Sequence, residues 1–182
     1  MSDRVLLFVT SLYLCWILLW QYSKFVRGEF TYHDLTIISD FFSNGLIHGR
    51  PFWVTDEQRS HLRLHFTPSL LVWLPAFIFA KTQFALIAVT ATSVAAGIFI
   101  TTREQYSCLT RAGVLLGWKV LLVGTYFICF AFNRYTLRVL SSAHFEPVFI
   151  LTAALLLVAV RRGCGYRSLL PLLLLALGVR QE

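Results

Sequence analysis

Six apolar stretches constrain this chain more than any other feature of its sequence. They cover residues 5–20, 68–80, 84–100, 112–132, 148–160 and 168–179. A helix that crosses a bilayer needs roughly 20 residues, so several stretches must extend into their polar flanks or stop short of a full crossing. The sequence therefore predicts an all-α, polytopic transmembrane bundle of about five to six helices within a single domain, residues 1–182.

The composition excludes most soluble classes. Hydrophobic residues make up 57% of the chain and charged residues only 14%, which a soluble globular domain does not show. The 16 basic and nine acidic residues give a net charge of +7, but the basic residues stand singly between apolar runs. Nucleic acid is therefore not an expected partner, whereas the lipid bilayer is.

The four cysteines do not form a disulfide framework. Cys15 and Cys129 lie inside apolar stretches, and Cys108 and Cys164 lie in short basic loops. We expect four reduced thiols. No small-residue cleavage site follows the first apolar stretch, so it is interpreted as a retained signal anchor of a multi-pass protein in the plasma (inner) membrane.

Polar chemistry is concentrated in one segment, residues 21–66. This segment holds five of the nine acidic residues and four of the five histidines, and its five basic residues balance its charge. Loops rich in Lys and Arg stay in the cytoplasm, so the neutral segment 21–66 is predicted to be an extracytoplasmic loop.

An amphipathic helix is predicted within this loop, at residues 35–47. Its apolar arc on a helical wheel contains Leu35, Ile37, Ile38, Phe41, Phe42 and Leu46. Its polar arc contains Thr36, Ser39, Asp40, Ser43 and Asn44, and Ile47 falls on that polar side. Such a division next to a membrane anchor predicts an interfacial helix whose apolar face enters the acyl boundary. Gly49 and Pro51 are expected to end it.

The loop charges also predict the number of crossings. Segments 1–4, 103–111 and 161–167 are basic and should all be cytoplasmic. Strict alternation of six spans cannot satisfy this requirement. The conflict disappears if residues 68–80, which contain Pro68 and Pro75, do not cross the membrane fully.

Asp34 has two interpretations. As the N-cap of the amphipathic helix it would accept backbone N–H bonds and stabilise the helix start. As a general base at the membrane surface it would activate an acceptor hydroxyl. The two roles oppose each other, because capping lowers the pKa of the carboxyl and makes it a weaker base.

Other ionisable residues have both structural and functional interpretations. His61 and His65 share a face but lack a third ligand nearby in sequence, so interfacial histidines explain them more simply than a metal. His144 and Glu146 stand beside an apolar stretch, where ionisable residues are costly and therefore candidates for function. Lys119 lies within the stretch 112–132 and must snorkel, pair or line a polar cavity.

The order of short motifs resembles a bacterial family of predicted polytopic membrane proteins, domain of unknown function 2079. The motifs are His33-Asp34-Leu35, His48-Gly49-Arg50, His65-Phe66-Thr67-Pro68, Leu70-Leu71, Leu74-Pro75, His144-Phe145-Glu146 and Arg180-Gln181-Glu182. The chain departs from that family at His33, where an aromatic residue is commoner, and at Leu64, where a small or acidic residue is expected.

That family is similar in architecture to the GT-C glycosyltransferases, which move a sugar from a polyprenyl-phosphate carrier to an extracytoplasmic acceptor. The resemblance implies Asp34 as the catalytic base. It implies polar neighbours around the site at His65, His144, Glu146 and Glu182, and the implied mechanism adds His33, Arg50 and Arg63 to the expected substrate-binding residues. Arg50 or Arg63 would hold the phosphate. No cofactor is identified, and a divalent metal held by His33, Asp34 and His65 is an open alternative.

Members of that family are several times longer, so the chain is interpreted as the truncated amino-terminal part of a larger GT-C-like module. As an isolated fragment it is expected to lack the helices that complete an acceptor site. The competing interpretation is a non-enzymatic membrane protein, a transporter half or an assembly subunit, in which Lys119, His144 and Glu146 line a polar path.

Overall fold

The computed structural model describes residues 3–29, 32–50, 53–55, 59–60, 74–80, 83–141 and 147–177. The helices are α1 Asp3–Val26, α2 Tyr32–Ile47, α3 Leu74–Ala80, α4 Gln83–Arg111, α5 Leu116–Ala131, α6 Arg134–Ser141, α7 Pro147–Arg161 and α8 Tyr166–Leu177. Two strands of two residues each, β1 (Trp53–Val54) and β2 (Arg59–Ser60), pair antiparallel. Apart from this short ribbon the described chain is helical, so the predicted all-α fold is confirmed.

Three of the described helices are long and apolar enough to cross a membrane. They are Asp3–Val26, Gln83–Arg111 and Leu116–Arg138, the last of which covers α5 and part of α6. Two further apolar helices, Val148–Arg161 and Tyr166–Ala176, are shorter than the roughly 20 residues of an average span. These helices indicate a membrane protein, as the composition predicts.

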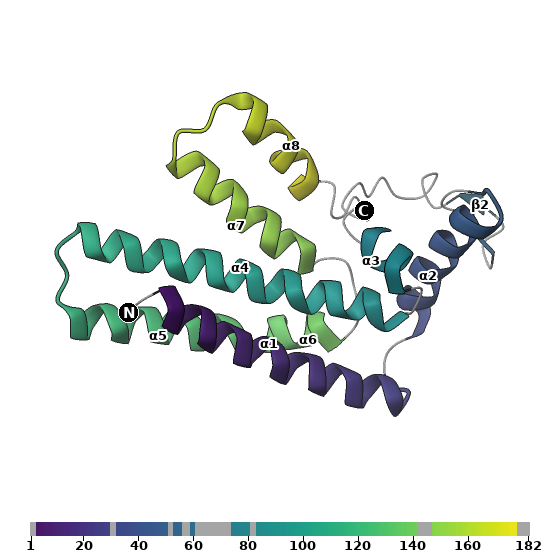
Figure 1. The fold of residues 1–182 in the computed structure, drawn as a ribbon, viewed down its shortest axis with the longest axis horizontal. Coiled ribbons are helices and arrows are strands. Elements are labelled where there is room, and N and C mark those ends of the chain that lie inside the picture. Colours follow the sequence, from purple (N-terminus) through teal and green to yellow (C-terminus); the bar gives the residue numbers. More distant parts are fainter. Residues whose placement is uncertain are drawn as a thin grey trace.

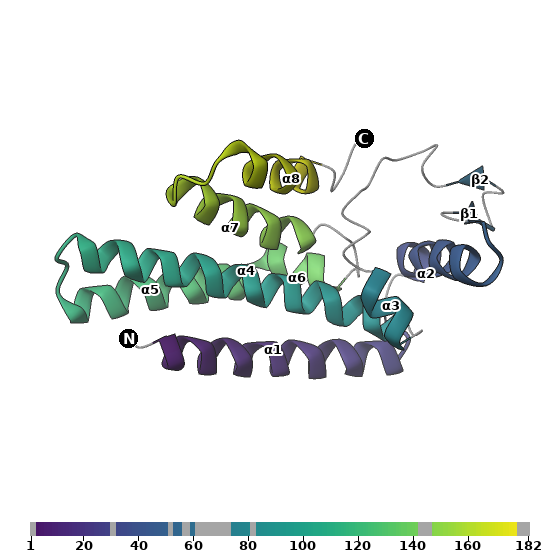
Figure 2. The ribbon, with the colours of Figure 1, turned by 45° about the horizontal axis from the view of Figure 1, so that its top comes forward.

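Helix α4 is the centre of the bundle. It contacts α1, α5 and α7, and α7 in turn contacts α8. Figures 1 and 2 both show α4 between α1 on one side and the α7–α8 hairpin on the other. The buried core joins α1, α4, α5 and α6 through Tyr13, Ile17, Ala91, Val94, Ala95, Ile98, Phe127, Ala131 and Leu140.

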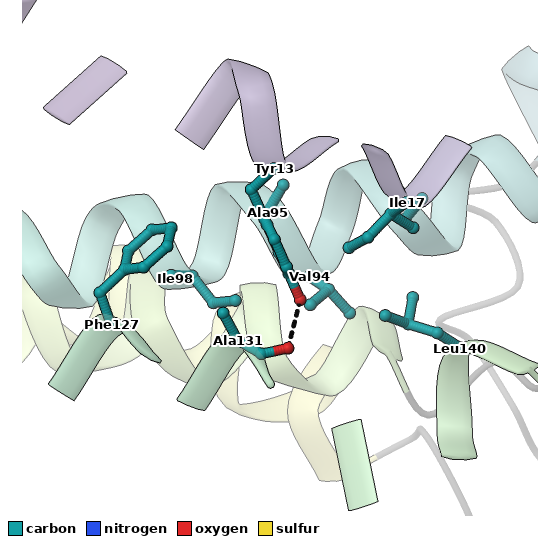
Figure 3. Close-up of a cluster of buried hydrophobic side chains, with 9 residues drawn as sticks. Tyr13, Ile17, Val94, Ala95, Ile98, Phe127, Ala131 and Leu140 are labelled. Atoms are coloured by element: carbon teal, nitrogen blue, oxygen red, sulfur yellow. Dashed lines mark hydrogen bonds between the residues drawn. The ribbon is translucent and has the colours of Figure 1, made fainter. Parts of the chain in front are cut away.

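Helix α1 supplies hydrogen bonds where the neighbouring helices end. The Tyr13 hydroxyl donates to the Ala131 carbonyl at 2.6 Å, and the Gln21 amide Nε2 donates to the Leu140 carbonyl at 2.8 Å. Ala131 is the last residue of α5, and the last carbonyls of a helix lack partners within it. Lipid offers no water to satisfy them, so Tyr13, drawn in Figure 3, stabilises the break between α5 and α6, and Gln21 satisfies a carbonyl in the last turn of α6.

The turns after α4 and α7 have the same geometry. Gly113 and Gly163 adopt φ of 70° and 65°, a left-handed conformation that favours glycine. The following amides, Val114 N and Cys164 N, donate to carbonyls five residues back at 3.1 and 3.0 Å, which is the Schellman arrangement. Each turn reverses the chain, so α4–α5 and α7–α8 form two helical hairpins whose turns lie toward the same end of the bundle (Figure 1).

The three basic segments meet at that end. Arg103 of α4 contacts Asp3 of α1 at 2.8 Å, and Arg161 of α7 lies 3.7 Å from Glu104 of α4. Helix α2 lies at the opposite end (Figure 1). The helix described in the stretch 68–80 is α3, with seven residues, where a full span needs roughly 20. This arrangement satisfies the loop-charge requirement, while the side of the membrane that each end faces stays a prediction.

Two local predictions require correction. Helix α2 begins at Tyr32, so Asp34 lies in its first turn rather than at the N-cap, although a carboxylate there is still favoured by the helix dipole. Helix α5 begins at Leu116, so Lys119 lies in its first turn rather than deep inside an apolar span. Its Nζ lies 5.6 Å from the ring centroid of Tyr106, a cation–π contact at the basic end.

Candidate functional site at the polar end of the bundle

The structure describes only part of the predicted site. His33 and Asp34 lie in the first turn of α2, and Arg50 follows the end of that helix. The remaining predicted residues, Arg63, His65, His144, Glu146 and Glu182, lie outside the described residues. The site can therefore be built only around α2 and the short β1–β2 ribbon.

Helix α2 is held at the end of the bundle by aromatic packing and by contacts with α4. Phe42 of α2 is 4% exposed and stacks on Phe77 of α3, with ring centroids 5.3 Å apart. Figure 1 shows the first turn of α2 near the start of α4 and its last turn farther from the bundle. The sequence predicted Phe42 in the acyl boundary, but this ring is buried within the protein.

The polar arc of α2 binds the ribbon. The Asp40 carboxylate accepts hydrogen bonds from the Thr55 backbone N–H at 2.6 Å, the Thr55 hydroxyl at 3.1 Å and the Asn44 amide at 3.1 Å. The Asn44 amide also donates to the Trp53 carbonyl at 2.8 Å. Both carboxylate oxygens of Asp40 are therefore occupied, and its role is to hold the chain after α2 against the helix.

A hollow of about 550 Å³ lies beside this network, lined by Asn44, His48, Arg50, Trp53 and Thr55. The Arg50 guanidinium lies 5.7 Å from the Trp53 ring centroid, within cation–π range. Gly49 adopts φ of 63°, which turns the chain after α2 and brings Arg50 to the hollow. An arginine beside an aromatic face can bind a phosphate or carboxylate, so the hollow suits an anionic group.

Asp34 and Arg50 do not lie together. Asp34 lies in the first turn of α2 and Arg50 follows its last turn, and the 13 steps from Asp34 to Ile47 alone rise roughly 20 Å along the helix axis. A base and the ligand of a leaving phosphate must lie on opposite sides of one anomeric carbon, which is much closer than this. This separation along the helix counts against Arg50 as the partner of Asp34, while the assignment of the phosphate to Arg50 or Arg63 stays a prediction.

The centres of the long apolar helices carry no ionisable charge. Residues 5–23, 83–102, 120–131 and 148–160, all described, contain no Asp, Glu, Lys, Arg or His. A transporter is expected to have ionisable residues meeting near the midplane. Lys119, one of the three residues assigned to such a path, lies at the basic end, and the other two, His144 and Glu146, lie outside the described residues.

The described residues contain no group of three or more His, Cys, Asp or Glu side chains that could hold a metal ion. His65, the third member of the predicted metal set, lies outside them. The alternative of a divalent metal at His33, Asp34 and His65 therefore stays a prediction.

Sequence reasoning missed the Asp40–Asn44–Thr55 network. Asp40 and Asn44 are four apart on the predicted polar arc, which showed that they share a face. Their partner Thr55 lies 15 residues beyond Asp40, and nothing in the sequence pattern indicated that the ribbon would fold back on α2.

Comparisons with known protein families, with curated proteins and with solved structures find no match to this chain. The resemblance to the uncharacterised bacterial family therefore rests on the short motifs alone.

Proposed function

We propose that this chain is a multi-pass plasma-membrane protein and the amino-terminal part of a GT-C-like glycosyltransferase. The proposed enzyme moves a sugar from a polyprenyl-phosphate donor to an acceptor on the extracytoplasmic side. One observation carries the proposal: α2, with His33-Asp34 in its first turn, lies at the end of the bundle opposite the basic segments. Basic ends stay in the cytoplasm, so Asp34 would lie on the extracytoplasmic side.

In the proposed reaction Asp34 is the general base. An acceptor hydroxyl attacks the anomeric carbon, its proton passes to the Asp34 carboxylate, and the bond between that carbon and the phosphate oxygen breaks. The configuration inverts and polyprenyl phosphate leaves. We assign the phosphate to Arg63, because Arg50 lies beyond the far end of α2.

The competing function is a non-enzymatic membrane protein. A transporter half is disfavoured, since the long apolar helices carry no charge at their centres in the described residues. An assembly subunit makes no demand on Asp34, so a test of that residue separates it from the enzyme.

The test compares two carboxylates of the same helix. The full chain is reconstituted in liposomes and supplied with a panel of polyprenyl-phosphate-linked hexoses and pentoses together with a panel of hydroxyl-bearing acceptors, and acceptor-dependent release of polyprenyl phosphate is measured. Asp34→Asn should lower release by about 100-fold or more while membrane insertion stays unchanged, since a general base contributes at least that factor. Asp40→Asn is the matched control and should retain the reaction while weakening the contact with Thr55.

Near wild-type release by Asp34→Asn would reject Asp34 as the base and would leave the assembly subunit as the better description. Because the chain is proposed to be the amino-terminal part of the enzyme, the same two variants are also compared in a full-length homologous protein, and equal activity of the Asn variant there would reject the base as well.

The orientation is tested separately. In a background with the four native cysteines changed to serine, an impermeant thiol reagent should label Ser60→Cys in intact cells and should reach Ala112→Cys only after lysis. Labelling of Ala112→Cys in intact cells would reverse the proposed orientation and place Asp34 on the cytoplasmic side.

A further inference from the structure

The basic end of the bundle contains a hollow of about 420 Å³ between the ends of α1, α4 and α7. It is lined by Asp3, Arg103, Glu104, Tyr106, Ser107, Thr110, Arg111, Arg161 and Arg162. Neither the predicted site nor the proposed function uses any of these residues. We infer that this hollow binds the phosphate of an anionic phospholipid headgroup.

The charge of the lining favours an anion. Four arginines oppose two carboxylates, which leaves a charge of +2. Through the helix dipoles the C-terminal ends of α4 and α7 each contribute about half a negative charge and the N-terminal end of α1 about half a positive charge, so roughly +1.5 remains. Basic residues that served only to neutralise the helix ends would leave no such excess.

The arginines differ in how firmly they are engaged. Arg103 contacts Asp3 through two hydrogen bonds, at 3.1 and 2.8 Å, and is committed to that carboxylate. Arg161 and Arg162 lie 3.7 and 3.8 Å from Glu104, beyond hydrogen-bond distance, and share a carboxylate whose side chain is 15% exposed. Their guanidinium donors are therefore held at the hollow by electrostatic attraction and can still bind a phosphate oxygen.

The neighbouring surface suits a lipid better than a free ion. Leu157 and Val160 of α7, in the turn before Arg161, are 47% and 57% exposed, and Leu7 of α1 is 56% exposed. In a membrane these side chains contact acyl chains directly below the headgroup. A phospholipid can thus place its phosphate in the hollow while its chains follow the apolar faces of α1 and α7, as basic pockets between membrane helices allow.

The experiment uses the purified full chain in neutral detergent and measures the midpoint of thermal unfolding during titration with lipid. Phosphatidylglycerol should raise the midpoint in a saturable manner, and phosphatidylcholine should not, because a ligand that binds the folded state stabilises it by mass action. The double variant Arg161→Gln/Arg162→Gln should raise the half-saturating lipid concentration about tenfold, the loss expected for one charge-assisted hydrogen bond. Arg167→Gln, which removes one positive charge in α8 outside the lining, should change it by less than about twofold.

The outcomes separate the sources of the phosphate. Stabilisation by inorganic phosphate alone, with no further effect of phosphatidylglycerol, would overturn the lipid assignment. Equal losses in Arg167→Gln and the double variant would show general attraction to the basic end and would overturn the pocket. If the double variant does not fold, Arg111→Gln replaces it, and an unchanged half-saturating concentration in that variant also overturns the inference. None of these outcomes depends on Asp34, so the proposed function stands or falls independently.

Discussion

Helices α4 and α5 form one hairpin, yet they occupy opposite environments. In the most apolar 18 residues of α4, 56% of the residues are buried inside the protein. In the most apolar 18 residues of Leu116–Arg138, which covers α5 and part of α6, only 17% are buried. Both stretches are apolar enough to cross a membrane. Hydropathy therefore identifies both as spans without telling which is the centre of the bundle.

The difference lies in the size of the side chains. The buried face of α4 contains many small residues, including Thr90, Ala91, Ser93, Ala95 and Gly97. Helix α5 exposes large ones, including Leu116, Trp118, Leu121, Leu122 and Ile128. Lipid tails are as apolar as leucine, so burial gains little from hydrophobicity in a membrane, and helices associate where small residues let their backbones approach closely. Size, rather than hydropathy, places α4 at the centre.

The largest expected effect comes from filling the closest contact of α4. A Cβ added at Gly97 would lie 2.7 Å from Ile150 Cγ2 and 3.0 Å from the Ile150 carbonyl oxygen, so α7 would have to move. Gly97→Leu should lower the free energy of unfolding by about 2–3 kcal/mol, the cost of overpacking. Unfolding in mixed micelles titrated with dodecyl sulfate measures this change.

Gly124 of α5 is the matched control. A Cβ there would meet no atom within 4 Å, so Gly124→Leu has the same change in helix propensity without the collision. We expect this variant to be as stable as wild type or slightly more stable. Equal destabilisation at both glycines would show that α4 and α5 are equally packed, which would contradict the comparison.

Much of this arrangement follows from the sequence. Apolar runs predicted the positions of α1, α4, α5, α7 and α8, since each run must be helical in lipid. Loop charges predicted that the basic segments meet at one end. The small residues of α4 were also present in the sequence, and their spacing could have indicated its central place.

Other features depended on partners far apart along the chain. The break between α5 and α6 is stabilised by Tyr13, 118 residues before the carbonyl it binds, and no local pattern indicates such a pairing. The segment 133–147 lies between two of the predicted apolar stretches and no helix was predicted there, yet it contains helix α6, whose start Asn133 caps by accepting from the Tyr135 amide at 2.8 Å. The candidate site was the least predictable part, because a residue proposed as a catalytic base, such as Asp34, has no periodic signature.

A smaller effect should come from the bond that joins α1 to the end of α5. Tyr13→Phe keeps the ring and its edge contact with Phe127, at 5.8 Å between centroids, but removes the donor to the Ala131 carbonyl. A carbonyl left without a partner in the apolar interior should lower the free energy of unfolding by about 1–2 kcal/mol. The same titration in dodecyl sulfate measures it.

Tyr135→Phe provides the comparison for that loss. Tyr135 of α6 is 75% exposed, so removing its hydroxyl should change stability by less than about 0.5 kcal/mol. If Tyr13→Phe also changed the free energy of unfolding by less than about 0.5 kcal/mol, the hydrogen bond to the Ala131 carbonyl would not stabilise the fold. Helix α5 would then be held to α1 by packing.

The smallest effect concerns the first turn of α5, where Lys119 lies over the Tyr106 ring of α4. This contact joins the two helices of the hairpin at the basic end, and a partly exposed cation–π pair contributes about 0.5–1 kcal/mol. Lys119→Gln should lose that amount of stability, whereas Lys119→Arg should keep most of it, because a guanidinium also stacks on an aromatic face.

A double-mutant cycle with Tyr106→Leu isolates the Lys119–Tyr106 pair from the other contacts of the tyrosine. Lys24→Gln is the control, because Lys24 contacts the ring of Trp20, at 4.7 Å from its centroid, and both residues belong to α1. This cation–π contact therefore lies within one helix. A coupling energy near zero between Lys119 and Tyr106 would mean that this pair does not stabilise the hairpin. Helix α5 would then be held to α4 by the Gly113 turn and by the other side-chain contacts along the hairpin.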